Sequence, residues 1–172
     1  NYYVTNEYFT EALVLDKEPV GEADLQIFLY TRDLGKITAR AVSARKITSK
    51  LASHLESLNF VTARLIHKNR FQVVDALKTD ALPKDQNTIA VLQLIKELAA
   101  EGQPDYDLWN LIKSGQLNGE VALAALGFDS RFAVCESCGT QKPGHFLIKQ
   151  LEYFCSSCLD PINRQNSFRV VA

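Results

Sequence analysis

All four cysteines of this 172-residue chain lie in two Cys-x-x-Cys pairs in its C-terminal third. Cys135 pairs with Cys138 and Cys155 with Cys158, and residues 139–154 separate the two pairs. This spacing is typical of a four-thiolate zinc site, in which each pair occupies a tight turn and supplies two ligands to one tetrahedral ion. Gly139 directly follows Cys138, where it favours such a turn. We therefore expect residues 132–160 to fold around a structural Zn²⁺.

The main alternative for these cysteines is a pair of disulfides, which would require an oxidising compartment. The N-terminal residues lack the basic, apolar and small-residue order of a secretory signal. No apolar run approaches the ~18 residues that span a bilayer. We therefore expect a cytoplasmic protein without a membrane segment, and zinc in preference to disulfides. Four thiolates leave no open position for a reactive water, so the expected role of the metal is structural.

The three histidines suggest less. His54 begins a His-x-Glu element like that of zinc deaminases, but Val134 and Phe154 precede the cysteine pairs, where deaminases have proline. His145 lies between the pairs and could replace one thiolate, whereas His67 is expected on the surface of a sheet. No phosphate-binding loop, dinucleotide-binding turn, nucleophile elbow or metalloprotease helix occurs. We therefore expect no catalytic residues.

Charge is distributed unevenly along the chain. The total is −1, and 47% hydrophobic with 23% charged residues is typical of a globular protein. Residues 32–70, however, hold nine Lys or Arg against two Asp or Glu, a net charge of +7. A local field of this size attracts polyanions even when the whole chain is nearly neutral.

The N-terminal half has the pattern of a small β-barrel. Strands are expected at 11–16, 23–31, 36–43, 59–68 and 71–77, and a helix at 48–58 with Ser49 as its N-cap. Three strands, a helix and two strands is the order of the five-stranded OB-fold, and an SH3-like barrel is the main competitor. OB barrels bind single-stranded nucleic acid on an open sheet face through aromatic and basic residues.

Strand alternation selects a candidate face. Leu25, Ile27 and Leu29 share the side expected to fill the barrel. The opposite side carries Phe28, Tyr30 and Arg32, and the third strand adds Lys36 and Arg40. Exposed rings beside cations suit stacked bases and their phosphates. The alternative is that Phe28 and Tyr30 pack beneath the second domain and leave only the charges free.

The rest of the chain predicts a small helical domain, so the expected class is α+β. Helices are expected at 85–100, 106–113 and 119–126, the first with a stripe of Ile89, Leu92, Ile95 and Ala99, and Trp109 is expected in the core. The resulting boundaries are 1–80 for the OB-fold domain, 81–131 for the helical domain, 132–160 for the inserted four-cysteine zinc element, and 161–172 for a C-terminal segment of the helical domain.

Several of these segments together resemble the RecO family of bacterial DNA repair proteins. The similar segments are 11–15, 21–24, 30–37, 41–46 and 49–51, with Leu126-Gly127-Phe128 leading to the first cysteine pair and Gly139. The order of barrel, helical domain and zinc element also fits, and the resemblance covers roughly residues 8–160. Gln150 and Leu151 depart from the family, whose members often have glycines before the second cysteine pair.

The resemblance implies a recombination mediator of the RecFOR pathway, without enzymatic turnover. Such proteins bind single- and double-stranded DNA and anneal complementary strands, and with RecR they help load RecA onto DNA coated by single-strand binding protein. Carried over by position, Lys36 and Arg40 would be the principal DNA contacts, and Arg32, Arg45, Lys46 and Lys50 would extend the track. The helical domain would hold the tail of single-strand binding protein. A nucleoid-associated location in the cytoplasm follows.

Two other functions fit the residues alone. One is an RNA-binding OB protein with a zinc ribbon, associated with translation, which would prefer RNA to DNA and would not anneal strands. The other is a zinc-stabilised scaffold whose barrel binds protein and whose binding is insensitive to salt.

Overall fold

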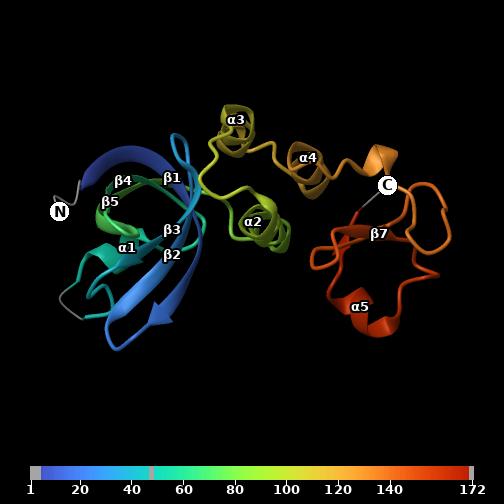
Figure 1. The fold of residues 1–172 in the computed structure, drawn as a ribbon, viewed down its shortest axis with the longest axis horizontal. Coiled ribbons are helices and arrows are strands. Elements are labelled where there is room, and N and C mark those ends of the chain that lie inside the picture. Colours follow the sequence, from blue (N-terminus) through green and yellow to red (C-terminus); the bar gives the residue numbers. More distant parts are fainter. Residues whose placement is uncertain (1–4, 47–48, 171–172) are drawn as a thin grey trace.

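The N-terminal half of the computed structural model, which describes residues 5–46 and 49–170, is a closed five-stranded barrel (Figure 1). Its strands are β1 (Asn6–Val20), β2 (Asp24–Thr31), β3 (Gly35–Ala41), β4 (Asn59–His67) and β5 (Phe71–Ala81), with the short helix α1 (Leu51–His54) between β3 and β4. The strands close in the order β1-β2-β3-β5-β4, and among these described strands β3 and β5 form the only parallel pair. This is the predicted OB topology.

The barrel has its own apolar interior, and Leu25, Ile27 and Leu29 lie in it as the alternation predicts. The first strand is longer than the predicted 11–16 because it serves two neighbours. Its first half, from Asn6 to Leu13, pairs with β4, and its second half, from Ala12 to Val20, pairs with β2. A register shift between Val14 and Asp16 bends the strand along its pairing with β2.

The predicted helix at 48–58 is too long, because α1 is a single turn. Residue 48, the first of the predicted helix, lies outside the described residues. Ser49 is not its N-cap, since Lys50 occupies that position without a side-chain cap. The chain leaves the helix because Leu58 must reach the sheet. The N–H of Leu58 donates to the carbonyl of Val14 at 3.0 Å, a normal length for a backbone hydrogen bond, and φ of Leu58 is +76°.

Three helices follow the barrel as predicted: α2 (Gln86–Leu98), α3 (Tyr106–Ser114) and α4 (Gly119–Ala125). Asp85, Asp105 and Asn118 cap them with side-chain hydrogen bonds to backbone N–H groups. The buried face of α2 carries Val91, Leu92, Leu94 and Ile95, whereas Ile89, which the stripe places inside, is 50% exposed. No helix in the described part of the chain is long and apolar enough to cross a membrane.

The helices pack on the outside of the barrel and form a second core with it. The side chains of Leu13, Tyr30 and Phe60, all from barrel strands, belong to this second core. Trp109 of α3 lies in it as predicted, with 4% of its surface exposed. The rings of Trp109 and Phe60 contact edge to face, with centroids 6.2 Å apart. The second core thus joins the barrel to the helices.

A glycine allows the closest approach between the barrel and the helical part. Gly35 has φ +68°, and a Cβ atom built on it would lie 2.2 Å from the carbonyl oxygen of Gln103, in the α2–α3 connection. One residue further, the carbonyl of Lys36 accepts the N–H of Gly102 at 2.8 Å. Backbone contact at this point requires glycine.

The cysteine element lies at the far end from the barrel, beyond the helices (Figure 1). It contains the 3₁₀ turn η1 (Ser130–Phe132), β6 (His145–Leu147), β7 (Glu152–Phe154), α5 (Pro161–Gln165) and β8 (Phe168–Arg169). Its sheet has the order β7-β6-β8.

The C-terminal segment, expected at 161–172 as part of the helical domain, bridges both parts. Through β8 it pairs with β6 of the cysteine element. Its Phe168 ring lies against α4, where a Cβ built on Gly119 would be 2.0 Å from that ring. The strand pairing was not predicted, because two residues are too few to show a period.

Candidate metal centre and nucleic-acid surface

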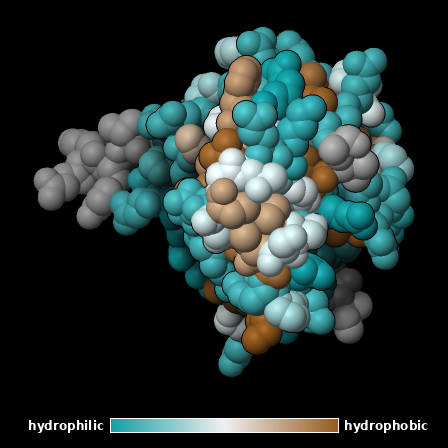
Figure 2. Space-filling model, turned by 90° about the vertical axis from the view of Figure 1, so that its right-hand side faces the viewer, coloured by the Kyte–Doolittle hydropathy of each residue, from teal (hydrophilic) through white to brown (hydrophobic). Residues whose placement is uncertain are grey.

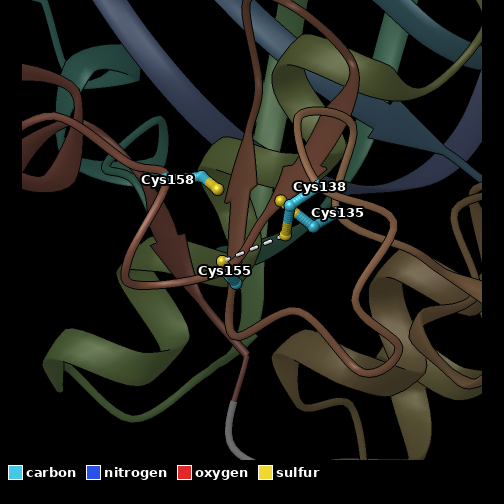
Figure 3. Close-up of side chains that lie close together, drawn as sticks. All are labelled: Cys135, Cys138, Cys155 and Cys158. Atoms are coloured by element: carbon cyan, nitrogen blue, oxygen red, sulfur yellow. Dashed lines mark hydrogen bonds between the residues drawn. The ribbon is translucent and has the colours of Figure 1, made fainter.

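The four cysteine sulfurs converge on one point, as the spacing predicts (Figure 3). All four Sγ atoms lie within 4.8 Å of one another, and those of Cys138 and Cys155 are 3.8 Å apart. A tetrahedral ion with metal–sulfur bonds of about 2.3 Å places its ligands about 3.8 Å apart. The arrangement can therefore hold a metal ion of this size. Among residues 5–46 and 49–170, it is the only group of three or more His, Cys, Asp or Glu side chains so placed.

Backbone turns hold the sulfurs in place. The N–H of Gly139 donates to the carbonyl of Cys135 at 2.8 Å, and φ of Gly139 is +71°, which confirms the expected glycine turn. In the second pair, the N–H of Leu159 donates to the carbonyl of Cys155 at 3.1 Å. Backbone N–H groups, that of Cys155 foremost, point at the Cys135 sulfur and lower the pKa of this thiol to about 6.

The same closeness prevents all four thiols from ionising unaided. The hydroxyl and N–H of Thr140 lower the pKa of the Cys138 thiol, whereas hydrogen bonds with the neighbouring cysteines raise the pKa of Cys158 to about 12. A cation among the sulfurs would remove this opposition, because thiolates are its ligands. The donor set therefore fits a thiophilic metal held by four sulfurs.

His145 lies beside this centre but is not among its ligands. Its Nδ1 is 2.9 Å from the hydroxyl of Ser167 and its Nε2 is 3.1 Å from that of Ser156, inside the second Cys-x-x-Cys turn. Burial lowers the pKa of His145, and Arg164 and Arg169 add to the shift. The alternative in which it replaces a thiolate is not supported, since both ring nitrogens are engaged elsewhere.

The other two histidines lie on the barrel. Nδ1 of His54 accepts the backbone N–H of Lys78 at 3.0 Å, and the cysteines that a deaminase would need lie in the element at the other end of the molecule. The ring of His67 packs on Phe71 with centroids 4.4 Å apart. Within the described part of the chain, neither histidine belongs to a group that could hold a metal.

The outer face of β2 and β3 is divided into two halves by the helices. Cross-strand pairs on this face are Tyr30 with Lys36, Phe28 with Thr38, and Gln26 with Arg40. The half with Tyr30 lies beneath the helical part, whereas the half with Arg40 lies towards the β1–β2 turn. Phe28 and Tyr30 therefore point out of the barrel as predicted. The sequence did not decide whether the helices or solvent would cover this face.

The two predicted stacking residues occupy the covered half. Tyr30 is 1% exposed, and burial raises its pKa to about 12. Phe28 is partly buried, and Nζ of Lys96 lies 4.1 Å above its ring. The expectation that Tyr30 offers an open ring to a base is wrong in this structure, because α2 and α3 pack over it. The alternative, packing beneath the second domain, is the one observed.

Lys36 lies at the border of the covered half. Its Nζ donates to the backbone carbonyl of Lys96, in the last turn of α2, at 2.8 Å. A cation at this position also interacts favourably with the helix dipole. The ammonium group of Lys36 is thus held by the helical part, and a phosphate would have to compete with that carbonyl.

Arg32 is exposed and paired with carboxylates. It contacts Asp33 and Glu11, each at 3.1 Å. The hydrogen bond with Asp33 raises the pKa of Arg32 and lowers that of Asp33. Ion pairs this exposed contribute little to stability, so an approaching phosphate could exchange for them at small cost.

The remaining predicted contacts gather in the open half. Nε of Arg40 donates to Asp24 at 2.6 Å, and the second oxygen of Asp24 accepts the N–H of Ser43 at 2.7 Å. Arg45 donates to the carbonyl of Gly21 at 3.0 Å. Lys46 and Lys50 are exposed in the same connection, on either side of residues 47–48. The structure thus divides the predicted track rather than aligning it.

Two residues missed by the sequence analysis lie beside Arg40. Arg70 and Phe71, at the β4–β5 turn, line a pocket of about 300 Å³ together with Arg40. The available indication was the position of Arg70 in the +7 segment, at a turn that OB barrels use for binding. Alternation could not reveal this pocket, because Phe71 begins β5 and the pattern within one strand does not show that β5 lies beside β3.

Comparison with known proteins finds similar sequences both for the barrel and for most of the chain. Residues 6–79, the barrel, match the family model described as "Recombination protein O N terminal". The chain is 29% identical to a DNA repair protein RecO from Desulforudis audaxviator over 90% of its own length and 71% of the relative's. It is 30% identical to one from Myxococcus xanthus over 77% and 64%, so it spans about two thirds of the length of these relatives. The barrel is thus a member of the RecO N-terminal family, and the chain as a whole is similar to RecO DNA repair proteins.

Proposed function

We propose that this chain is a recombination mediator in DNA repair. In this proposal it binds single- and double-stranded DNA, anneals complementary strands, and together with RecR helps load RecA onto DNA coated by single-strand binding protein. It acts without catalytic turnover, in the bacterial cytoplasm, on nucleoid DNA. Family membership supports the repair role, and the finer steps rest on the surface described above.

The observation that carries the proposal is the basic open half of the β2–β3 face. Arg40, Arg45, Lys46 and Lys50 lie on or next to this half, and Arg32 and Lys36 lie towards the helices. Annealing requires a surface that lowers the repulsion between two phosphate backbones while it leaves bases free to pair. Arginine and lysine side chains on one sheet face meet this requirement.

We further propose that the metal is Zn²⁺ and that its role is structural. Cys135, Cys138, Cys155 and Cys158 would hold it, and a four-sulfur set leaves no position for a reactive water. When bound, the ion supplies the positive charge that lets all four thiols ionise. The partners RecR and the tail of single-strand binding protein would bind outside this centre, the latter on the helical part.

Charge reversal on the barrel tests the DNA-binding proposal. The double variant Lys36→Glu/Arg40→Glu is expected to lose measurable binding to labelled single-stranded DNA, because two phosphate contacts become repulsive. In the wild type, about five phosphate contacts predict a log–log salt slope of roughly −3.5 on single strands. Fluorescence anisotropy at several salt concentrations measures both quantities.

Two further variants separate binding from folding. Arg45→Glu/Lys46→Glu changes the same face without touching the contact between Lys36 and α2, and is also expected to weaken binding. Lys142→Glu/Lys149→Glu changes the charge equally on the exposed cysteine element and is expected to bind as the wild type does. Wild-type affinity in a correctly folded barrel variant would contradict the assignment. A preference for matched RNA, with no annealing of complementary DNA, would favour the translation-associated alternative.

A further inference from the structure

The pocket of about 300 Å³ on the open half of the barrel lies where the sheet closes between β3 and β5. Its lining residues are Val20, Gln26, Thr38, Ala39, Arg40, Arg70 and Phe71. Only two residue pairs, Ala39 with Phe71 and Arg40 with Gln72, join β3 to β5. The short junction leaves a hollow in the barrel surface beside the β1–β2 turn.

The walls of this pocket combine the three kinds of group that hold a nucleotide. Phe71 contributes an aromatic ring that is half-buried and packed against the barrel interior. Arg40 and Arg70 contribute two cations, and Gln26 and Thr38 contribute polar groups from the outer face of β2 and β3. A flat ring beside cations is the arrangement that holds single-stranded nucleic acid without reading its sequence.

The ring of Phe71 is held in place by two aromatic neighbours. Its centroid lies 4.4 Å from that of His67, its cross-strand partner, and 6.0 Å from that of Tyr8. These contacts fix the ring at the end of the barrel. Because the ring is already ordered in the free protein, little conformational entropy is lost when a base stacks on it, which favours binding.

Asp24 orients the arginine side of the pocket. It binds Arg40 through Nε alone, so this contact uses one of the five N–H donors of the guanidinium group. The N–H of Ser43, together with Arg40 and Arg70, holds the pKa of Asp24 below its usual value, so the carboxylate stays charged. Among the described residues Arg70 forms no ion pair. Donors for a phosphate thus remain on both arginines.

We propose that this pocket is a nucleobase subsite, in which Phe71 stacks on one base of a single strand while Arg40 and Arg70 bind the phosphates on either side. The inference rests on the proposed function, since it assumes that the barrel binds nucleic acid. It assigns the stacking role to the β4–β5 turn, whereas Phe28 and Tyr30 serve the contact with the helices. Asp24 is a positioning residue for Arg40.

The test compares two oligonucleotides of equal length, one of thymidines and one with the bases absent from its central positions. The wild type is expected to bind the thymidine strand roughly five- to tenfold more tightly, the lower end of what one stacked base contributes. Phe71→Leu is expected to lose this difference and to bind the abasic strand with unchanged affinity. Arg70→Gln is expected to weaken both strands and to reduce the salt slope by about 0.7.

A base analogue gives a second measurement. 2-Aminopurine placed in the strand is expected to be quenched by the wild type and by Phe71→Trp, which keeps an aromatic surface, and not by Phe71→Leu. Phe9→Leu is the matched control, because Phe9 is an aromatic residue of β1 that is 69% exposed outside the pocket. It is expected to behave as the wild type does.

The outcomes separate the inference from the proposed function. If the wild type binds neither strand at low salt, the proposed function fails. If it binds both with salt dependence, but Phe71→Leu keeps the thymidine preference and the quenching, the function stands and the subsite is wrong. Thermal melting shows whether each variant is folded. If Phe71→Leu does not fold, Phe71→Trp and Arg70→Gln still test whether the pocket binds a base and its phosphates.

Discussion

The barrel and the cysteine element, the two ends of this molecule, are stabilised in opposite ways. The barrel closes five strands of 7 to 15 residues around an apolar interior of its own. The cysteine element has strands of two or three residues, and Phe132 and Ile162 in this part are 82% and 76% exposed. Figure 2, which views that end, shows apolar residues at separate places among hydrophilic ones.

The buried side chains of the cysteine element also belong to a shared structure. Phe146, Tyr153 and Val170 pack in the core that includes the helices. The element therefore depends on four converging thiols on one side and on the helical part on the other. A segment too small for its own core can therefore be specified by the spacing of its cysteines and by one neighbouring surface.

The largest expected effect comes from removing the metal. Chelation, or the variant Cys135→Ser, is expected to unfold residues 133–159 locally, because the two Cys-x-x-Cys turns then lose the metal–sulfur bonds that would tie them together. Hydrogen exchange followed by mass spectrometry should show lost amide protection there, while the strands β1 to β5 keep theirs. Metal content measured beside it identifies the ion. Unchanged protection after complete removal of metal would show that the cysteine element does not depend on a metal for its stability.

An intermediate effect is expected where the barrel meets the helices. Gly35→Ala is expected to lower the free energy of unfolding by about 1–3 kcal/mol more than Gly115→Ala, because its new methyl group would collide with Gln103. Both glycines have φ near +70°, and a Cβ on Gly115 has no neighbour within 4 Å, so backbone strain is matched. Urea denaturation of the two variants measures the difference. Equal losses would show that the contact at Gly35 can relax.

The smallest effect is expected in the turn between β6 and β7. Leu151 has φ +61° and is 50% exposed, so it bears the strain of a left-handed conformation. Leu151→Gly is expected to stabilise the element by about 0.5–1 kcal/mol, since relief of strain exceeds the added flexibility of the unfolded chain. Gln150→Gly, at a position without a positive φ, should instead destabilise it. Thermal melting of both metal-loaded variants tests the sign.

The sequence predicted the parts of the fold that repeat or that have fixed spacing. Alternation along Leu25, Ile27 and Leu29 identified the interior of the barrel, and the order of strands identified its topology. The spacing of the cysteines identified the cluster of four sulfurs, because each turn positions its own two side chains. Strand alternation and cysteine spacing are local patterns, and the packing of the other segments does not alter them.

What the sequence could not predict depends on distant segments. Alternation shows on which side of a strand Tyr30 lies, but not that a helix some seventy residues later covers that side. Likewise, Phe71 reaches the pocket only because β5 closes the barrel against β3. The short helix α1 ends early for the same kind of reason, since Leu58 must bond to Val14 of β1.

The edge-to-face contact of Trp109 with Phe60 makes the molecule its own spectroscopic reporter. Trp109 is the single tryptophan of the chain, and it is buried in the core that joins β4 to α3. Its emission therefore reports on this core, and it shifts when the barrel and the helices separate. A titration with unlabelled DNA can thus show, from intrinsic fluorescence alone, whether binding changes the contact between the barrel and the helices.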